Sequence, residues 1–313
     1  MTVPSSFLCK RLGVNLEQLF FYSITCPRRY KHYQIDKRNG GKRKISQPAK
    51  NLKIVQRILL NEFFKPKMKI HSSATAYRTN RSISDNVRPH LDNGFLLKMD
   101  FTNFFPSIKA TDFQNYLIKN KVIDKEMKEE LKLVSNIFFM WFERNLVLSI
   151  GAPSSPLISN ALMYEFDTQV SNLAEERGVA YTRYSDDLSF STNAKDVLFD
   201  FPDLIAGILN TIESPRITLN EDKTVFTSKK HNRHITGITI SNDGKASLGR
   251  ERKRELRSRV FSTSKVQLAP KELAKLKGHL AFAHSVEPEF VEKLYKKYPD
   301  QMKLLKPRNT IKD

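Results

Sequence analysis

The sequence has very little cysteine and no long apolar run, and each absence excludes a class of protein. Its 313 residues include two cysteines, Cys9 and Cys26, and neither has neighbours at metal-ligand spacing. Two thiols cannot form the disulfide framework of a small secreted domain, so a reducing compartment is expected. There is no run of about 18 uncharged apolar residues to cross a membrane, and the N-terminal segment lacks the apolar centre of a signal peptide. We therefore predict a cytoplasmic protein with no membrane partner.

Acidic residues are also scarce relative to basic ones. The chain has 33 Asp and Glu against 53 Lys and Arg, which gives a formal net charge of +20. A surface this positive attracts polyanions, with nucleic acid as the first candidate and acidic membrane as the second. Because 40% of the residues are hydrophobic, the chain can still bury a substantial core.

Repeats, low-complexity tracts and long polar linkers are absent, so we expect lobes of one continuous assembly. Residues 1–30 are predicted to form a short helical arm, and residues 31–245 the central part. Residues 246–313 are predicted to form a basic helical lobe, because the stretch from 250 onward has 17 Lys or Arg and 8 Asp or Glu.

Spacing and turn residues predict the elements of the first third of the chain. Apolar side chains recur every three or four positions from 51 to 65, which indicates an amphipathic helix. Ser82 can cap a short helix that ends near Gly94. Residues 39–48 predict a glycine turn followed by a basic strand that ends at a proline.

The clearest helix of the sequence is expected over residues 155–178. Ser155 is a good N-cap, Pro156 suits the first helical position, and Gly178 closes the segment.

Three aspartates stand at positions that favour metal chemistry. The run GFLLKMDF (94–101) predicts a buried strand that delivers Asp100 near its end. VAYTRYSDDLSFST (179–192) predicts a hairpin whose turn carries Asp186 and Asp187. Adjacent like charges beside strands are unfavourable without compensation. The pair is therefore either a solvated turn or part of a Mg²⁺ site.

A third carboxylate at the end of a neighbouring buried strand would complete a site for two Mg²⁺ ions about 3.5 to 4 Å apart. Such a pair of ions holds both the attacking and the leaving oxygen of an in-line phosphoryl displacement. Nucleotide addition is the reaction that uses this arrangement.

Three motifs in order carry a family resemblance. MDFTNFFPSI around Asp100, GAPSSP from Gly151 and YTRYSDDLSF around the Asp-Asp pair closely resemble the ordered motifs of reverse transcriptases. The resemblance implies a right-hand polymerase of the α+β class, with fingers and an antiparallel-sheet palm in 31–245 and a helical thumb in 246–313.

Within that superfamily the chain most resembles bacterial retron reverse transcriptases, from about Arg29 to Leu304. DNVRPH (85–90) is similar to the retron Asn-Ala-x-x-His element, with Val87 where the family usually has Ala. HITGITI (234–240) is similar to the Val-Thr-Gly element, with Ile where the family has Val.

The resemblance implies roles for single residues. Asp100, Asp186 and Asp187 match the family's catalytic metal ligands, with two Mg²⁺ ions as the cofactor. Phe105 matches the aromatic steric gate, which would exclude a ribose 2′-OH and select dNTPs. Phe104 beside it is expected to pack in the core. Arg43 matches a basic finger residue at the triphosphate.

Further nucleotide contacts are implied at Gly151, Ala152 and Lys223. Lys223 matches a palm lysine that would neutralise or protonate leaving pyrophosphate, although a surface role fits a lone lysine equally well. Many relatives have Gln before the glycine of the second motif, whereas Ile150 stands here. Ser154 and Ser155 can bond template or backbone, and helix capping explains Ser155 as well.

The resemblance also implies partners. Retron enzymes bind a structured non-coding RNA, begin DNA synthesis from a guanosine 2′-OH and make branched RNA-linked single-stranded DNA. The thumb is expected to bind RNA through Arg250, Arg254 and Arg257 on one helical face. Family members commonly serve antiphage defence with a separately encoded effector protein.

Two other functions remain open from the sequence. The chain can be a catalytically silent RNA-binding scaffold, or a reverse transcriptase of another type, such as a group II intron or diversity-generating enzyme. His231 and His234 can be read as a zinc pair, but with no cysteine nearby we expect a polar loop before a strand instead.

Overall fold

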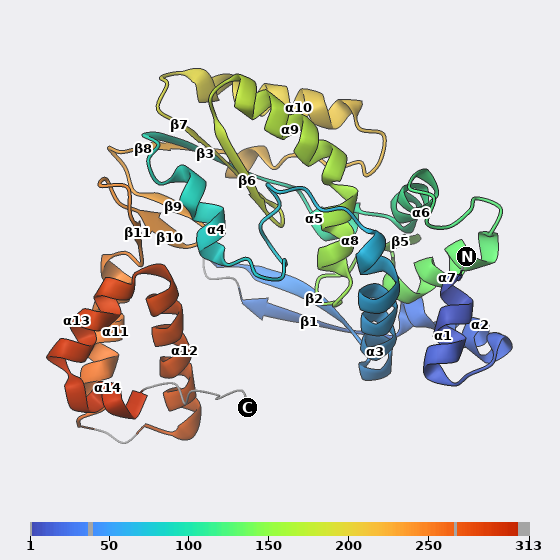
Figure 1. Cartoon of the computed structure of the whole chain (residues 1–313), viewed down its shortest axis with the longest axis horizontal. Helices are drawn as coiled ribbons and strands as arrows, with labels where there is room; N and C mark the ends of the chain where they lie inside the picture. Colours follow the sequence, from blue (N-terminus) through green and yellow to red (C-terminus); the bar gives the residue numbers. More distant parts are fainter. Residues whose placement is uncertain (1, 37–39, 266–267, 306–313) are drawn as a thin grey trace.

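The computed structural model describes residues 2–36, 40–265 and 268–305. The start of the predicted glycine turn at 39 and the last eight residues of the basic tail lie outside this part. Two separate hydrophobic cores organise the described chain. The larger core joins the N-terminal helices to the central sheet, and the smaller one joins the C-terminal helices to a second sheet (Figure 1).

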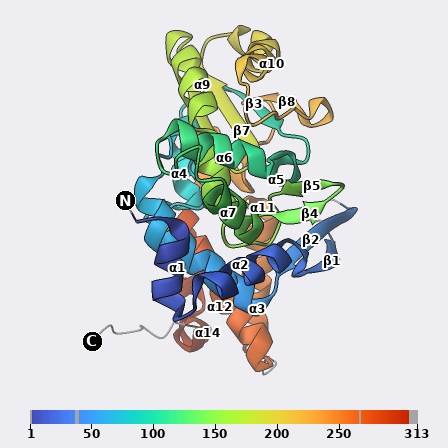
Figure 2. The ribbon, with the colours of Figure 1, turned by 90° about the vertical axis from the view of Figure 1, so that its right-hand side faces the viewer.

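The first third of the chain forms a helical arm, a two-stranded hairpin and a long helix. The arm, the basic strand and the helix were predicted, whereas the strand that pairs with the basic strand was not. The arm packs against the helix α7 (Lys128–Phe138; Figure 2). The predicted helix 51–65 is present, but its second half has wider, π-type turns. The elements are α1 (Pro4–Leu12), α2 (Leu16–Thr25), η1 (Cys26–Arg28), β1 (Tyr30–Asp36), β2 (Lys42–Pro48), α3 (Lys50–Ile58), η2 (Leu59–Phe64) and η3 (Lys65–Lys67).

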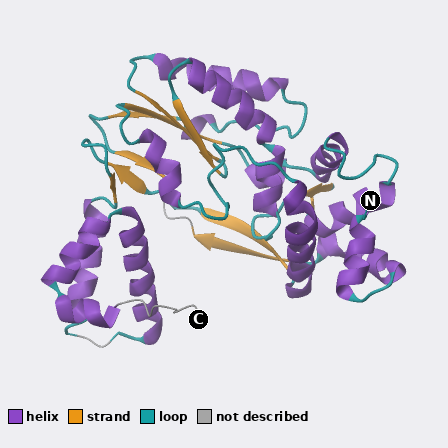
Figure 3. Cartoon of the chain, in the orientation of Figure 1, coloured by secondary structure: helices purple, strands orange, loops and turns teal. Residues whose placement is uncertain are grey.

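The central sheet has four antiparallel strands in the order β6-β7-β3-β8. Alternate residues of each strand point to opposite faces. Helices α9 and α10 cover one face of the sheet (Figure 3). Leu97 and Phe190 point to this face and belong to the larger core, and the Phe190 ring lies 5.2 Å from that of Phe201 in α10. The strands are β3 (Phe95–Asp100), β6 (Ala180–Tyr184), β7 (Asp187–Thr192) and β8 (Val225–Ser228), and the covering helices are α9 (Tyr164–Glu176) and α10 (Phe201–Thr211).

The predicted single helix over 155–178 is wrong in two respects. The structure has α8 (Ser155–Leu162) followed by α9, with a break at Met163. The N-cap is Ser154 rather than Ser155, so Pro156 is one position further into the helix than expected. The break lets Asn160 of α8 and Asp167 of α9 contact the same buried arginine. Gly178, with φ 64°, ends the segment as predicted.

The C-terminal part is helical, as predicted, and begins from a small sheet. β9 (Arg233–Ile235), β10 (Ile238–Ile240) and β11 (Ala246–Ser247) pair in the order β11-β10-β9. The four helices that follow bury their apolar residues together with Ile235, Ile238 and Ile240. They are α11 (Arg250–Ser262), α12 (Pro270–Val286), α13 (Pro288–Lys297) and α14 (Pro299–Leu305).

The remaining elements connect these units. Ser82 precedes α4 and forms a reciprocal capping box with Asp85, which confirms the predicted cap. Over the described residues, none of the helices combines the length and apolar character that a membrane span requires. The connecting elements are α4 (Ile83–Val87), η4 (Arg88–His90), α5 (Phe104–Ser107), α6 (Ala110–Lys119), α7 (Lys128–Phe138), β4 (Met140–Phe142), β5 (Asn145–Val147), η5 (Val197–Asp200) and η6 (Glu221–Lys223).

Candidate active site

The strand register brings the three predicted aspartates together. Asp100, the last residue of β3, lies directly opposite Asp187, the first residue of β7. Residues directly opposite in an antiparallel pair point to the same face, here the one not covered by α9 and α10. Asp186 lies in the tight turn, and its carbonyl accepts a hydrogen bond of 3.2 Å from the Phe101 amide. Ser185 has φ 63°, so the turn takes a left-handed step just before the acidic pair.

The three carboxyl groups shift one another's protonation. Although the Asp187 side chain is exposed at the start of β7, desolvation by the surrounding protein and the charges of Asp186 and Asp100 raise its pKa to about 7. Burial and the charge of Asp100 also raise the pKa of Asp186. Crowded carboxylates favour a bound proton or cation, because each negative charge raises the cost of ionising the others. The site is therefore poised to accept cations.

One of the predicted basic residues, Lys223, contacts this cluster, and the charge of another acts on it. The Nζ atom of Lys223 lies 2.7 Å from Oδ1 of Asp100. The backbone of Asn220 donates a 2.8 Å hydrogen bond to the Asp100 carbonyl, which fixes the turn that carries Lys223. Arg43 of β2 is near enough for its charge to oppose the pKa rise of Asp186. The positive charge of β2 thus acts on the carboxylates of the central sheet.

The donor set suits a hard cation such as Mg²⁺, which prefers carboxylate oxygens with water and phosphate. Within the described ranges, no three His, Cys, Asp or Glu side chains already have the spacing of a metal-binding group. The ammonium group of Lys223 forms an ion pair with Asp100, and the pKa of Asp187 beside it is raised to about 7. The residue types fit Mg²⁺. In this arrangement the negative charge is compensated by Lys223 at Asp100 and by the raised proton affinity of Asp187.

Gly151 sits where β2 and the loop before α8 approach closely. A Cβ atom there would lie 3.1 Å from Cγ2 of Ile45 and 3.1 Å from the Ser46 carbonyl, and its φ of 125° favours glycine. The Ser46 amide donates a 2.8 Å hydrogen bond to the Ile150 carbonyl. Ala152 is buried beside this contact. The loop thereby fixes the strand that carries Arg43, and Ile150 takes part through its backbone.

The two phenylalanines after Asp100 have different environments. Phe104 is buried and stacks on Phe101 with ring centroids 5.4 Å apart, so it is a core residue, as predicted. Phe105 is only partly buried at the edge of the larger core. Phe105 is therefore the ring of the two that remains accessible to a ligand.

A buried ion pair behind the hairpin was not predicted. Arg183 of β6 and Asp167 of α9 are both fully buried, with Nε to Oδ1 at 2.8 Å and Nη2 to Oδ2 at 2.7 Å. Nη1 of Arg183 also donates to the Ser185 carbonyl at 2.9 Å and to Asn160 at 3.1 Å. The pair thus holds the left-handed turn residue before the two aspartates. The available sequence signal was Asp167 itself, a lone acid on the apolar face of its helix.

His90 is a second buried polar residue near the sheet. Its ring nitrogens lie 2.7 Å from the Ser191 hydroxyl and 2.8 Å from the Thr182 hydroxyl. Burial lowers the pKa of His90 to about 3, so the ring is neutral. His90 belongs to the retron-like element 85–90 and joins that segment to β6 and β7. Of the other two histidines considered, His231 precedes β9, as expected for a loop before a strand, whereas His234 lies within β9, with Nε2 3.1 Å from Nζ of Lys98.

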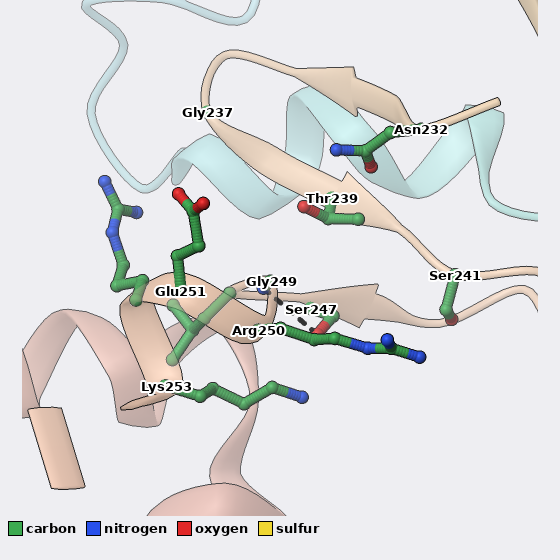
Figure 4. A pocket seen from close by; sticks show the side chains of 11 residues that line it. Asn232, Gly237, Thr239, Ser241, Ser247, Gly249, Arg250, Glu251 and Lys253 are labelled. Carbon is green, nitrogen blue, oxygen red and sulfur yellow. Dashed lines mark hydrogen bonds between the residues drawn. The ribbon is translucent and has the colours of Figure 1, made fainter. Parts of the chain in front are cut away.

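The three predicted RNA-binding arginines lie apart from the carboxylates. Arg250, Arg254 and Arg257 are exposed on α11 at spacings that share one helical face. Arg250 also lines a cavity of about 680 Å³ between the small sheet and the start of α11. Hydroxyl groups and Lys253 line the same cavity (Figure 4).

Comparison with known proteins agrees with this geometry. The sequence profile of the family "Reverse transcriptase (RNA-dependent DNA polymerase)" matches residues 35–240. Retron Ec83 reverse transcriptase of Escherichia coli is 41% identical over 86% of each chain, and Retron Ec73 reverse transcriptase of the same species is 33% identical over 88% of this chain and 89% of its own. In fold, the chain is similar to telomerase of Candida albicans, with a TM-score of 0.51 and 12% identity, covering 95% of this chain and 60% of the telomerase. The predicted right-hand polymerase fold is confirmed.

Proposed function

Because the chain belongs to the reverse transcriptase family and is an RNA-directed DNA polymerase, we propose that it is the polymerase of a retron. It would copy part of a structured non-coding RNA into branched, RNA-linked single-stranded DNA. The observation that carries the proposal is Asp100 opposite Asp187, with Asp186 in the adjoining turn. The retron assignment is supported by the relatives and by the elements 85–90 and 234–240.

Asp100, Asp186 and Asp187 would hold two Mg²⁺ ions beside the end of the growing strand. When bound, these ions supply positive charge for the attacking and leaving oxygens of nucleotidyl transfer. Lys223 is already directed at Asp100 and is exposed along most of its side chain. A bound cation would release its ammonium group, which could then neutralise the leaving pyrophosphate.

The incoming dNTP would contact residues from both sides of the site. The Arg43 guanidinium is suited to bidentate contacts with phosphate oxygens. The backbone of Gly151 and Ala152 would border the sugar and base, and its close contact with β2 holds this backbone in place. Phe105 would fill the volume of a ribose 2′-OH. Arg43 would thus attract the triphosphate by charge, and Phe105 would exclude ribonucleotides by shape.

The RNA would extend from the central sheet to the thumb, which we propose comprises residues 246–313. Arg250, Arg254 and Arg257 present exposed charges on one face of α11, where duplex phosphates can be neutralised. Synthesis is proposed to begin from a guanosine 2′-OH of that RNA, in the bacterial cytoplasm. As in the family it resembles, the product would serve antiphage defence with a separately encoded effector protein.

The test compares dNTP incorporation on a primed RNA template with Mg²⁺ for two proteins. We expect Asp186→Asn combined with Asp187→Asn to abolish incorporation. The matched control is Asp203→Asn, an exposed aspartate of α10 on the covered side of the sheet, which should retain it. Incorporation that survives the double change, or is absent from the native protein, contradicts the assignment and favours a silent RNA-binding scaffold.

The retron assignment has its own test. Nucleic acid that copurifies with the protein should contain DNA joined to RNA through a 2′-5′ linkage. A debranching enzyme should therefore release the DNA from the RNA. A product that this enzyme leaves intact would indicate a reverse transcriptase of another type.

A further inference from the structure

Tyr77 is an exposed aromatic residue held in an unfavourable backbone conformation. Its φ is 60° and 54% of its surface is exposed. The left-handed region is rare for residues other than glycine, asparagine and aspartate, and a bulky aromatic there is an outlier. Across the described chain no hydrogen bond involves the Tyr77 hydroxyl group. Nothing in its packing therefore compensates for the strained conformation.

The backbone before Tyr77 is fixed to the catalytic hairpin. The amide of Arg183 donates to the Ser73 carbonyl at 2.8 Å, and the amide of Thr75 donates to the Arg183 carbonyl at 2.9 Å. The side chain of Asn160 donates to the Ala76 carbonyl at 2.9 Å. This segment is thus anchored on two sides up to the residue before the tyrosine. Strain held by a rigid surrounding is typical of ligand-binding positions.

The Tyr77 ring stands between the hairpin and a cavity. Its centroid is 6.3 Å from that of Tyr184, which lies directly opposite Asp187 in the sheet. Tyr77 also lines a cavity of about 470 Å³ between the end of the helix at Leu60–Lys65 and the start of α8. Pro153 and Pro156 give this cavity apolar walls. Its volume falls in the range of about 300 to 1,000 Å³ that is usual for small-ligand pockets.

Basic side chains complete the lining. Lys65 and Arg78 border the same cavity, and neither is within ion-pair distance of a carboxylate among the described residues. Nη1 of Arg78 holds the carbonyl of His71 at 3.0 Å, which keeps the guanidinium in place. An aromatic ring, apolar walls and unpaired positive charges are the features that bind an unpaired nucleotide.

We propose that Tyr77 and this cavity bind the unpaired template nucleotide that is next to be copied. Its base would stack on the Tyr77 ring, and its phosphate would lie near Lys65 and Arg78. β6 is the edge strand of the sheet, so Tyr77 lies beyond Tyr184 on the side away from β8 and Lys223. The incoming nucleotide would lie at the carboxylates, so the RNA template that pairs with it would lie on the Tyr77 side of the sheet. The inference rests on the family's template-copying activity and adds the residues that receive the template.

The first experiment uses the native protein and two RNA templates. One template has an abasic site at the position immediately after the nucleotide being copied, and the other has it two positions further on. Addition of a single dNTP to a DNA primer is measured against template-primer concentration. We expect the first template to raise KM by about 5- to 150-fold, because stacking of one base contributes about 1 to 3 kcal/mol. The second should behave as intact RNA. Equal KM values for intact RNA and the first template would overturn the proposal.

The second experiment removes the ring and not the base. Tyr77→Asn keeps a residue that tolerates positive φ, so its melting temperature should equal or exceed that of the native protein. Its KM for intact template should rise by the same factor, and an abasic site should add nothing further. Tyr77→Phe keeps the ring and should behave as native protein, as should Phe199→Asn, which removes an exposed ring far from the cavity. If the abasic site raises the KM of Tyr77→Asn as much as that of the native protein, the role of this tyrosine is refuted. If the native protein itself adds no dNTP, the family activity is refuted instead.

Discussion

Replacing Asp167 by Asn would leave the Arg183 guanidinium charged, buried and without a carboxylate partner. Both side chains have no exposed surface, and the pair is joined by two hydrogen bonds of 2.8 and 2.7 Å. Removing one partner of such a pair costs about 3 to 5 kcal/mol. That is a large share of the roughly 5 to 15 kcal/mol by which a folded protein is stable. We therefore expect Asp167→Asn to lower the urea midpoint strongly with little change in slope.

Replacing both partners should separate stability from activity. Arg183→Met combined with Asp167→Leu removes both charges, and apolar replacements of buried ion pairs are often neutral or stabilising. The double variant should therefore be far more stable than the sum of the single changes predicts. It still lacks the 2.9 Å hydrogen bond from Arg183 to the Ser185 carbonyl. The turn that carries Asp186 is then free to move, and the rate of dNTP incorporation should fall.

The assays are urea unfolding and single-nucleotide incorporation on the same preparations. Tyr181→Phe provides the matched control, because it removes only the hydroxyl group that donates to the Asp167 carboxylate at 2.8 Å and should cost about 1.5 to 3 kcal/mol. Either of two results would refute the reasoning. One is a free energy of unfolding for Asp167→Asn that is equal to or higher than that of the Tyr181→Phe control. The other is a stable double variant that polymerises at the native rate.

Three further changes test other parts of the site. Gly151→Ala should lower stability by more than about 1 kcal/mol, because the new Cβ meets β2 at 3.1 Å with φ at 125°; thermal unfolding checks this, and an unchanged melting temperature would contradict it. His90 stays neutral in the folded protein, with a pKa of about 3, whereas the unfolded chain binds a proton below about pH 6.5, so stability should fall by about 1.4 kcal/mol per pH unit as the pH drops from 6.5 towards 3. His90→Gln should remove that part of the slope in urea titrations, and an identical slope would show that another group is responsible. Phe105→Ala should let ribonucleotides compete with dNTPs in incorporation assays, whereas unchanged discrimination would exclude Phe105 as the gate.

Local patterns predicted much of the fold because they depend on neighbours in the sequence. Apolar spacing identified the strand that ends at Asp100, and β-forming residues around a tight turn identified the hairpin at 186 and 187. The order of the three motifs led to the polymerase fold. The helix over 155–178 was predicted in one piece because the break at Met163 has no proline or glycine to mark it.

Only the tertiary structure decided which distant residues meet. The register of β3 against β7 sets Asp100 opposite Asp187, and the turn after Leu219 brings Lys223 to the same carboxylate. The ion pair behind the hairpin and the strained Tyr77 likewise depend on contacts between segments far apart in the chain. The sequence by itself determined the residue types that can do the chemistry. Their distances, burial and charge balance depend on packing, because the energies of burial and of paired charges exist only once separate segments exclude water together.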